Sequence, residues 1–511
     1  MALPPGVIPV GHQGLIAKFG LKVPPPSVTS TAGAGARRTV IDARRTAEHY
    51  PATYVPSDDL VGHLKFALRY EPTDLGVLAQ TFAVCDPREI EAWVRAEPNG
   101  AYARKAWFFY EWLTGKTLDI ADAGPVAYVD ALDPEQHIVA TGLHSRRHKV
   151  INNLLGSPNF CPTVRKTPVI DAFMAEAIDE EARQLIAGCD PKVLARAINY
   201  LYTKETKSSF EIERETAKGQ RAERFVAALR AAKQFDATKF DSLVALQNVI
   251  VDPRYAAKGF RDFQNFVGET IGGYREVVHF ICPRPEDVES LMRDWAEMTK
   301  RLREATHPVV SAALAAFGFV FIHPFEDGNG RIHRYLIHQI LSAEGFSPPD
   351  VLFPVSAAIV RDIKGYDSAL ESFSHAIQPY IDWQWTSKQA IEVKNNTAHL
   401  YRYFDATQLV EFLYEKVIET VRKDLKEELD YVSVYDAART AVLDIIDMPD
   451  NRATLFINSI MQNNGSISKN RRKKFPELSD DDVATLQTAV QEILANQRGV
   501  EEDDDNSPWH P

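Results

Sequence analysis

A short stretch near the middle of the 511-residue chain concentrates residue types that could bind and transfer a phosphate-bearing group. It runs from His323 to Arg334 and reads HPFEDGNGRIHR. Gly328 and Gly330 flank Asn329 at the point where a helix is expected to begin. Backbone N–H groups that converge in a turn at the start of a helix form a binding site for anions. The stretch therefore predicts a cradle for phosphate.

The charged residues of the stretch agree with a phosphate ligand. Arg331 and Arg334 project from neighbouring positions of the expected helix. Cations in a first helical turn oppose the helix macrodipole, so a bound polyanion would stabilise them, and guanidinium groups suit bidentate phosphate contacts. A carboxylate at Asp327 would repel phosphate unless a divalent cation joins the two, which predicts Mg²⁺. A histidine side chain ordinarily titrates near neutral pH, so we expect that His323 could accept a proton from an attacking hydroxyl group.

Each of these residues taken alone has a structural explanation. His323 could cap a helix, the glycines could form a turn, and the charges could be solvated. The joint pattern of base, acid, Gly-Asn-Gly and paired arginine within one short stretch is harder to assign to structure alone.

Two helices are expected to hold the stretch in place. The apolar run 308–322 predicts a buried helix that ends just before Pro324, and the run is too short to span a bilayer. Ile332, Leu336 and Ile340, spaced at four residues, predict the buried face of the following helix.

Composition limits the class of protein. The chain is 45% hydrophobic and 25% charged, which is typical of globular proteins. Its formal net charge of −12 argues against wholesale binding of nucleic acid. The four cysteines are far apart and form no CxxC pair, which indicates reduced thiols, and the N-terminus shows no secretory signal. We expect a cytoplasmic protein without membrane segments.

Changes in composition along the chain predict five segments. They are a flexible arm rich in Pro, Gly, Ser and Thr (1–35), an N-terminal accessory region (36–165), a helical domain that would carry the chemistry of the central stretch (166–390), a C-terminal helical module (391–500) and a solvated acidic tail (501–511).

The central stretch resembles the signature of the Fic-domain family, His-Pro-Phe-x-(Asp/Glu)-Gly-Asn-Gly-Arg-x-x-Arg, with every fixed position filled. With its surroundings, the resemblance extends over roughly residues 190–390. It implies a mainly α fold, a Fic-type helical bundle with a small β-hairpin flap. Family members transfer AMP from Mg·ATP to Ser, Thr or Tyr hydroxyl groups, so the resemblance implies a protein adenylyltransferase that uses ATP and Mg²⁺ and acts on a protein target, which could be the chain itself.

The resemblance also implies a role for each residue of the motif. His323 would deprotonate the target hydroxyl group, Phe325 would pack inward, and Asp327 would hold Mg²⁺. The residues implied to bind ATP are Gly328, Asn329 and Gly330, which form the anion hole, and Arg331 and Arg334, which contact the outer phosphates.

An upstream segment resembles the inhibitory helix of one Fic class, (Ser/Thr)-x-x-x-Glu-(Gly/Asn). Ser209 and Glu213 match this pattern, whereas Arg214 stands where Gly or Asn is expected. The resemblance implies that Glu213 pairs with Arg334 and blocks productive placement of the γ-phosphate. The alternative is an ordinary helix face with solvated acidic residues.

A second upstream segment, 274–282, resembles the hairpin flap on which Fic proteins dock a target segment by strand addition. The alternative is a hairpin that only covers the core. The residues expected to dock the target are Tyr274, Val277, Val278, His279 and Phe280.

The C-terminal module carries a basic cluster, 469–474, and could resemble a winged-helix appendage. A solvated basic loop is the alternative, so nucleic-acid binding by this module stays open, as does a homodimer. Two other functions also stay open. In the first, Glu213 positions water and the site removes AMP from modified proteins. In the second, the chain is a regulator in which bound nucleotide only sets conformation.

Overall fold

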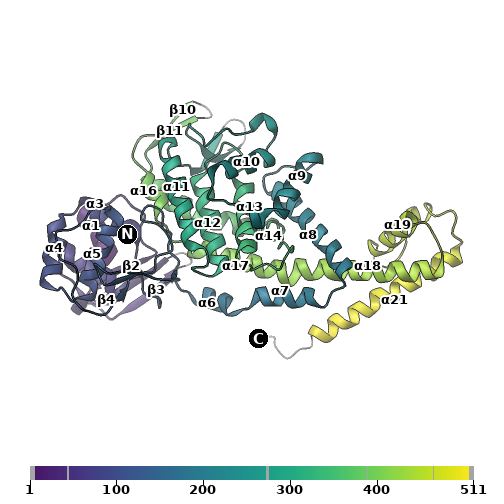
Figure 1. Ribbon diagram of the computed structural model, residues 1–511, viewed down its shortest axis with the longest axis horizontal. Coiled ribbons are helices and arrows are strands. Elements are labelled where there is room, and N and C mark those ends of the chain that lie inside the picture. Colours follow the sequence, from purple (N-terminus) through teal and green to yellow (C-terminus); the bar gives the residue numbers. More distant parts are fainter. Residues whose placement is uncertain (1–5, 43–44, 272–274, 388–389, 464, 506–511) are drawn as a thin grey trace. The chain divides into compact units, whose positions relative to one another are not determined.

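The computed structural model describes residues 6–42, 45–271, 275–387, 390–463 and 465–505, which are mostly helical (Figure 1). The mainly α fold expected from the sequence is thereby confirmed. The described residues form two compact units. The first unit comprises the described parts of 1–177, 205–350 and 355–418, and the second those of 178–204, 351–354 and 419–511. No helix among the described residues combines the length and the apolar character that a membrane crossing needs.

The chain begins with a folded segment where the sequence suggested a flexible arm. β1 (Val7–Val10), α1 (Gly11–Phe19) and β2 (Val28–Gly33) lie within 1–35, so that prediction is wrong for the described residues 6–35. The sheet has the order β1-β2-β4-β3, completed by β3 (Arg38–Asp42) and β4 (Arg45–Pro51), and β2 pairs with β4 in parallel. These elements completely bury apolar side chains such as Val10, Leu15 and Ala32, which a count of Pro and Gly residues does not reveal.

Helices and a small sheet complete the N-terminal part of the first unit. The helices, which bury a common apolar core, are α2 (Leu60–Tyr70), α3 (Leu75–Val84), α4 (Pro87–Ala96) and α5 (Ala101–Thr114). The sheet has the order β5-β7-β6 and is formed by β5 (Val129–Asp130), β6 (Leu143–Ser145) and β7 (Val150–Asn152). α6 (Pro168–Ala175) follows.

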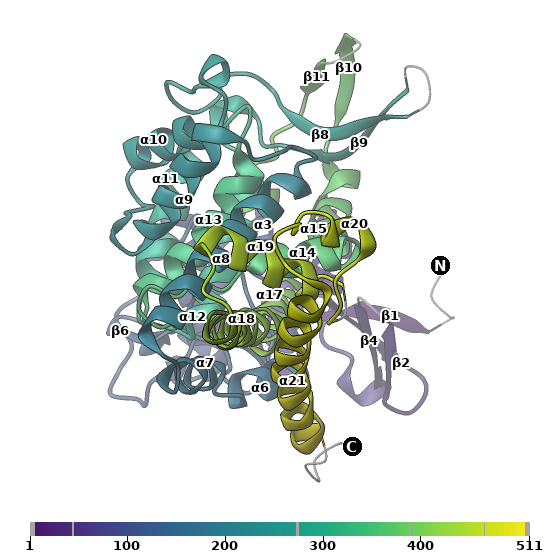
Figure 2. The ribbon, with the colours of Figure 1, turned by 90° about the vertical axis from the view of Figure 1, so that its right-hand side faces the viewer.

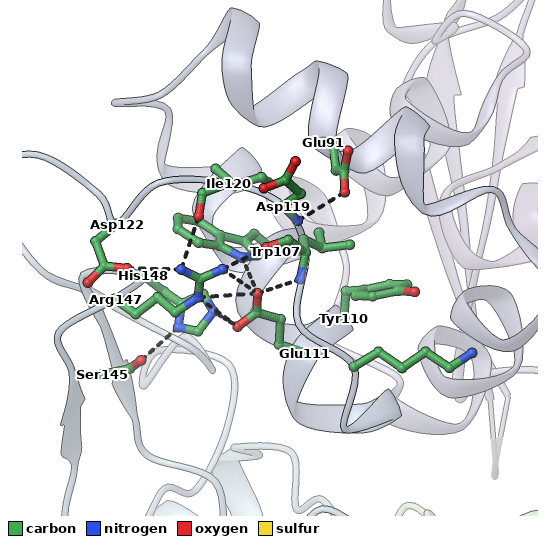
Figure 3. Close-up of polar contacts among 12 residues, drawn as sticks. Glu91, Trp107, Tyr110, Glu111, Asp119, Ile120, Asp122, Ser145, Arg147 and His148 are labelled. Atoms are coloured by element: carbon green, nitrogen blue, oxygen red, sulfur yellow. Dashed lines mark hydrogen bonds and ion pairs between the residues drawn. The ribbon is translucent and has the colours of Figure 1, made fainter.

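A cluster of polar contacts joins α5 to the loop that follows it and to the turn between β6 and β7 (Figure 3). Glu111 accepts hydrogen bonds from Nε1 of Trp107 (2.7 Å) and from the backbone N–H of Leu118 (2.9 Å). It also pairs with Arg147 (2.9 Å) and lies 2.9 Å from Nε2 of His148. We call these five residues the Glu111 cluster. It fixes the course of the chain between α5 and β6.

The remainder of the first unit surrounds one apolar helix, α12 (Pro308–Ile322). Thirteen of its residues are buried, on all sides of the helix, which is typical of a central core helix. α13 (Asn329–Ala343) packs along it (Figure 1). The other helices of this part are the C-terminal portion of α8 (Pro191–Ile212), α9 (Gly219–Arg230), α10 (Phe240–Ile250), α11 (Pro285–Leu302), α14 (Val355–Arg361), α15 (Ile363–Ile377), α16 (Ala398–Arg402) and α17 (Thr407–Glu419).

Two hairpins lie side by side in the first unit (Figure 2). β8 (Phe266–Ile271) pairs with β9 (Arg275–Ile281), and β10 (Trp383–Ser387) pairs with β11 (Ala390–Val393). The rings of Phe266 and Trp385 connect the hairpins in a T-shaped contact with centroids 5.5 Å apart.

The second unit is helical. Its elements are α7 (Ile178–Ala187), the N-terminal portion of α8, a π-helical turn (Thr420–Leu425), α18 (Lys426–Ile445), α19 (Asp450–Met461), α20 (Lys469–Arg472) and α21 (Asp480–Asp505). The described residues of this unit contain no strand that could form the wing of a winged helix. α21 continues to Asp505, so the first part of the predicted acidic tail, 501–505, is helical rather than irregular.

Candidate active site

His323 stands at the C-terminal end of α12, in the left-handed backbone conformation (φ 52°). Its backbone N–H closes the helix on the carbonyl of Phe319 (3.0 Å). Nδ1 lies 3.2 Å from the carbonyl oxygen of Val320. Because a carbonyl oxygen only accepts, Nδ1 carries the hydrogen in this contact and Nε2 is left as an acceptor. The geometry therefore orients a basic nitrogen away from the helix.

The surroundings of His323 favour its neutral form. Burial, together with the positive charge of Arg261, lowers the pKa of His323 to about 4. Arg261 itself is held by the carbonyl oxygen of His323 (2.8 Å from Nε), while its backbone N–H bonds the carbonyl of Pro324 (2.8 Å). At neutral pH the imidazole is thus ready to accept a proton.

The loop after His323 is closed by Asn329, which is 2% exposed. Its Oδ1 accepts from the N–H of Phe325 (3.0 Å), and its Nδ2 donates to the Phe325 carbonyl (2.8 Å). The ring of Phe325 is buried against Phe319 and Phe260, with centroids 6.3 and 5.7 Å away. The side chain of Asn329 is thus fully used in holding the loop, which leaves backbone groups to meet an anion.

Two glycines shape the start of α13. Gly328 is its N-cap residue with φ 91°, a conformation that side chains rarely adopt. A methyl group on Gly330 would lie only 2.2 Å from Oε1 of Glu213. The bare backbone of Gly330 therefore lets a carboxylate approach the helix N-terminus, where anions are favoured.

Glu213 reaches this position as part of a contact with Arg334, which is completely buried. Arg334 donates from Nη2 to Oε1 of Glu213 (2.8 Å) and to the carbonyl of Ser209 (2.7 Å). Its Nε lies 3.0 Å from Oγ of Ser209. Ser209 and Glu213, singled out in the sequence, are therefore brought together with the second motif arginine.

Arg214 occupies the position where the sequence pattern led us to expect Gly or Asn, and its φ of 57° is the conformation that Gly or Asn adopts most readily there. The N–H of Glu215 bonds the carbonyl of Phe210 (3.0 Å), the bond that defines a Schellman ending of a helix. Arg214 thus performs the backbone function of Gly or Asn at that position, in a conformation that strains an L-residue by roughly 1–2 kcal/mol.

Arg331, 1% exposed, completes the site. Its Nη2 donates to Oδ1 of Asp327 (2.8 Å) and its Nη1 lies 3.2 Å from Oε2 of Glu215. The side chain of Asp327 is 42% exposed. Nε of Arg331 and Nη1 of Arg334 are buried without a hydrogen-bond partner among the described residues. Buried donors of this kind fit an incoming anion.

Asp327 is suited to a magnesium ion that arrives with a nucleotide. Magnesium is usually bound by one or two carboxylates together with substrate phosphates and water. In the described part of the chain, no group of three or more His, Cys, Asp or Glu side chains could hold a metal by itself. One exposed carboxylate beside buried arginines therefore fits a shared metal–phosphate site and does not form a metal site of protein ligands alone.

The predicted docking residues lie on β9, except Tyr274, which is outside the described residues. Val277, Val278, His279 and Phe280 alternate across the hairpin. Phe280 packs inward, against Phe321 (6.2 Å between ring centroids) and other rings, while His279 faces Glu269 of β8 (3.4 Å). β8 and β9 form a two-stranded sheet, so each has an outer edge where a further strand could pair.

Comparison with known proteins bears on the same residues. The Fic/DOC family profile matches residues 238–341, which include the whole stretch from His323 to Arg334. The chain is 36% identical over 118 residues to the protein adenylyltransferase Fic of Nematostella vectensis, covering 22% of this chain and 26% of that protein. It is 27% identical over 182 residues to the protein adenylyltransferase fic-1 of Caenorhabditis elegans, covering 33% of this chain and 34% of that protein.

The chain therefore contains a segment, residues 238–341, that is similar to the Fic/DOC family.

Among solved structures, a Fic family protein from Desulfovibrio desulfuricans is similar, with 19% identity, 67% of this chain and 94% of that chain covered, and a TM-score of 0.37. A Fic-domain protein from Bacteroides thetaiotaomicron gives 19% identity, 51% and 96% coverage, and a TM-score of 0.36. The chain spans only about a quarter to a third of the length of the two curated relatives. The likeness is therefore limited to that part, and any statement on activity has to rest on the geometry of the site.

Several residues of the candidate site were not found by sequence reasoning. Arg261 supports the backbone of His323, Gln247 donates to the carbonyl of Asp327 (3.2 Å), and Glu215 contacts Arg331. Two of them lie 62 and 80 residues from their partners in the motif. For Glu215 a signal did exist, because it stands two residues after Glu213 in the segment already singled out.

Proposed function

We propose that this protein is an adenylyltransferase that transfers AMP from Mg·ATP to a Ser, Thr or Tyr hydroxyl group of a protein target. The observation that carries the proposal is the pair of buried arginines on α13, opposite a neutral histidine. Arg331 and Arg334 have donors free for phosphate, and Nε2 of His323 is free to accept a proton. A site for a polyanion and a base for a hydroxyl nucleophile would thus lie on one helix–loop–helix segment, from the end of α12 to the start of α13.

The chemistry follows from these groups. Nε2 of His323 takes the proton of the target hydroxyl group, and the hydroxyl oxygen attacks the α-phosphorus of ATP. The bond from the α-phosphorus to the bridging oxygen of the leaving pyrophosphate breaks, so AMP stays on the target. The arginines and the backbone N–H groups at the start of α13 stabilise the charge on the phosphates, and holding both reactants in line supplies much of the acceleration.

Asp327 is the residue that would hold magnesium, and magnesium when bound would neutralise charge on the phosphates. Asp327 is available for this because its side chain is partly exposed and, among the described residues, its carboxylate pairs with Arg331 alone.

We further propose that the structure corresponds to an inhibited state. The Glu213 carboxylate bonds Arg334 and lies against Gly330, where an anion at the α13 N-terminus would sit. A carboxylate and a phosphate compete for such a site because both accept charge-assisted hydrogen bonds from the same donors. Release of Glu213 would open the place for the terminal phosphate.

The β8–β9 hairpin is proposed to dock the target segment. The support is its outer edge, which can pair with an extended strand, and the loop anchored by Arg261, which connects the hairpin region to the backbone of His323. Replacing a backbone donor on that edge with proline should reduce target modification more than nucleotide binding. An equal loss of both would indicate misfolding instead.

The function is tested by incubating the purified chain with cell lysate, Mg²⁺ and ATP labelled on either the α- or the γ-phosphate. We expect α-label on protein, more with Glu213→Gly than with the native chain, and none with His323→Ala in the Glu213→Gly background. Absence of label on any protein with Glu213→Gly contradicts the proposal, and label from the γ-phosphate alone would indicate a kinase.

The two alternatives give different results in the same assay. An enzyme that removes AMP would strip label from proteins modified beforehand, and would lose this activity with Glu213→Gly. A regulator that only senses nucleotide would bind ATP and transfer nothing, and His323→Ala would leave its behaviour unchanged.

A further inference from the structure

A second acidic residue of the inhibitory segment lies against the phosphate site. Oε2 of Glu215 is 3.2 Å from Nη1 of Arg331 and 2.7 Å from Nη2 of Arg221. Arg331 is 1% exposed, so the Glu215 carboxylate is in direct contact with a buried cation. Glu215 therefore forms an ion pair with Arg331, just as Glu213 forms one with Arg334.

The contact is built into the end of α8. Phe210 is completely buried and lies between two guanidinium groups, with Arg221 4.8 Å and Arg331 5.3 Å from its ring centroid. The left-handed residue Arg214 reverses the chain directly after Glu213, and Glu215 is the next residue. One helix ending thus delivers two carboxylates to two arginines.

The number of charges at the site indicates how many carboxylates have to leave before Mg·ATP can bind. The carboxylates of Glu213, Glu215 and Asp327 are connected by ion pairs to the guanidinium groups of Arg221, Arg331 and Arg334, three charges of each sign. Magnesium-bound ATP carries roughly two net negative charges near neutral pH. Departure of both glutamates leaves two net positive charges for it. Departure of Glu213 alone leaves one, with Glu215 still on Arg331.

We propose that Glu215 is a second carboxylate that competes with phosphate, and that nucleotide enters fully only when Glu213 and Glu215 both leave. The proposal rests on the proposed function, because it takes Arg331 and Arg334 as the phosphate-binding pair. Arg221 stacks on Phe210 and donates to the carbonyl of Ile250 (2.7 Å), so its positive charge stays at the site when Glu215 leaves.

The two glutamates should act on different nucleotides. Arg331 contacts Asp327, the residue placed to hold the metal, and so serves the phosphates nearest the metal, which ADP and ATP share. Arg334 lies almost one helical turn further along α13 and serves the terminal phosphate of ATP. Glu215 should therefore weaken binding of ADP and ATP alike, whereas Glu213 should weaken ATP binding more than ADP binding.

The test is calorimetric titration of the full chain with Mg·ADP and Mg·ATP. Glu215→Gln should raise the affinity for both nucleotides by about tenfold, and Glu213→Gln should raise it mainly for ATP. The control is Glu211→Gln, which removes an exposed charge from the same helix end and should change either affinity less than twofold. Thermal unfolding of each variant confirms that it is folded.

Each outcome decides between the proposals. If Glu215→Gln leaves both affinities within twofold of the native chain while Glu213→Gln raises ATP affinity, Glu215 is only a structural partner of Arg221 and the inference is wrong. If no variant binds either nucleotide, the proposed function fails as well. If Glu211→Gln and Glu215→Gln raise nucleotide affinity equally, the gain comes from the lower negative charge of the protein and the inference is wrong.

Discussion

The described residues of the first unit include two places where glutamate pairs with a buried or half-buried arginine, and the two are built differently. In the Glu111 cluster, Arg147 donates to Glu111, to the carbonyls of Leu118 and Ile120, and to Asp122 (Figure 3). Burial alone would raise the pKa of Glu111, but hydrogen bonds from Arg147, Trp107 and Leu118 lower it to about 2. Backbone groups of the loop take part on both sides of the ion pair.

At the α13 N-terminus the arginines are buried more deeply and satisfied less completely. Nε of Arg331 and Nη1 of Arg334 are buried and have no hydrogen-bond partner among the described residues. Arg147 and Glu111 have no buried polar side-chain atom that lacks such a partner in the described part of the chain. The carboxylate of Glu213 is 34% exposed, against 13% for Glu111. A pair completed by backbone groups stabilises a fold, while a pair with unused donors and an exposed carboxylate can be exchanged for a ligand.

The largest effect is expected from breaking the structural pair. Glu111→Ala removes the carboxylate that Arg147 and His148 share and leaves Arg147 with Asp122, whose side chain is 69% exposed. It should lower the free energy of unfolding by about 2–4 kcal/mol, below the full range for buried pairs because Arg147 is 26% exposed. Thermal unfolding measures this, with the exposed Glu89→Ala as control. If the free energy of unfolding changes by less than about 0.5 kcal/mol, the Glu111 cluster does not stabilise the fold. If the folded variant binds nucleotide with a different affinity, the cluster is not purely structural.

Gly330→Ala tests whether the exchangeable site depends on close approach to the α13 backbone. Its methyl group would lie 2.2 Å from the Glu213 carboxylate and should exclude a phosphate as well. We expect at least a tenfold loss of Mg·ATP affinity, about 1.4 kcal/mol, measured by calorimetry in the Glu213→Gly background, where the native clash is absent. Unchanged affinity would show that the anion binds elsewhere.

Glu213→Gln keeps the shape of the side chain and removes its charge. AMP transfer should rise by about tenfold because Arg334 becomes available to phosphate. The thermal midpoint should move by only a few degrees, since Ser209 still bonds Arg334. The rate is measured with α-labelled ATP. A large loss of stability without any gain in the rate of AMP transfer would show that the Glu213–Arg334 pair stabilises the fold, as the Glu111 cluster does, and does not inhibit the enzyme.

The central site could be predicted because its residues are contiguous. His323, Asp327 and Arg331 fall on one helix–loop–helix, so their spacing alone brings them together. Glu215 and Arg261 could not be assigned in this way, because they reach the motif from 116 and 62 residues away. Their positions depend on the packing of α8 and of the loop before β8, which no local pattern encodes.

The N-terminal fold was predicted least well for a similar reason. β2 pairs in parallel with β4, and the connection between them contains β3, so the pairing is not a local hairpin. Composition showed many Pro and Gly residues but gave no sign of the partner strand. Buried side chains such as Val10 and Leu15, absent from any periodic pattern that we recognised, are what order the segment.

A smaller effect is expected from Arg214→Gly. Glycine adopts the left-handed conformation without strain, so the closed helix ending should be stabilised by roughly 1 kcal/mol. Basal AMP transfer should then fall by about fivefold, while the thermal midpoint rises by a few degrees. Increased transfer would mean that the Arg214 side chain, and not its backbone, maintains the inhibited state.

The smallest effect concerns pH. Because burial and Arg261 lower the pKa of His323 to about 4, its neutral form persists as the pH falls from 8 to 5. A histidine of ordinary pKa would lose about thirtyfold of its neutral form over that range. A plot of kcat/KM against pH for AMP transfer by Glu213→Gly should therefore show no decrease below pH 6.5 that is due to protonation of His323. We call such a decrease an acid limb. An acid limb near pH 6.5 would contradict the proposal that His323 stays neutral over this range and acts as the base.

The account depends on the buried arginines being a phosphate site that Glu213 closes. The most direct measurement is a crystal structure of Glu213→Gly with Mg²⁺ and a non-hydrolysable ATP analogue. We predict the terminal phosphate on Arg334, the metal on Asp327 and the α-phosphate beside Nε2 of His323. A triphosphate bound elsewhere, with Arg334 still bonded only to Ser209, would contradict the account.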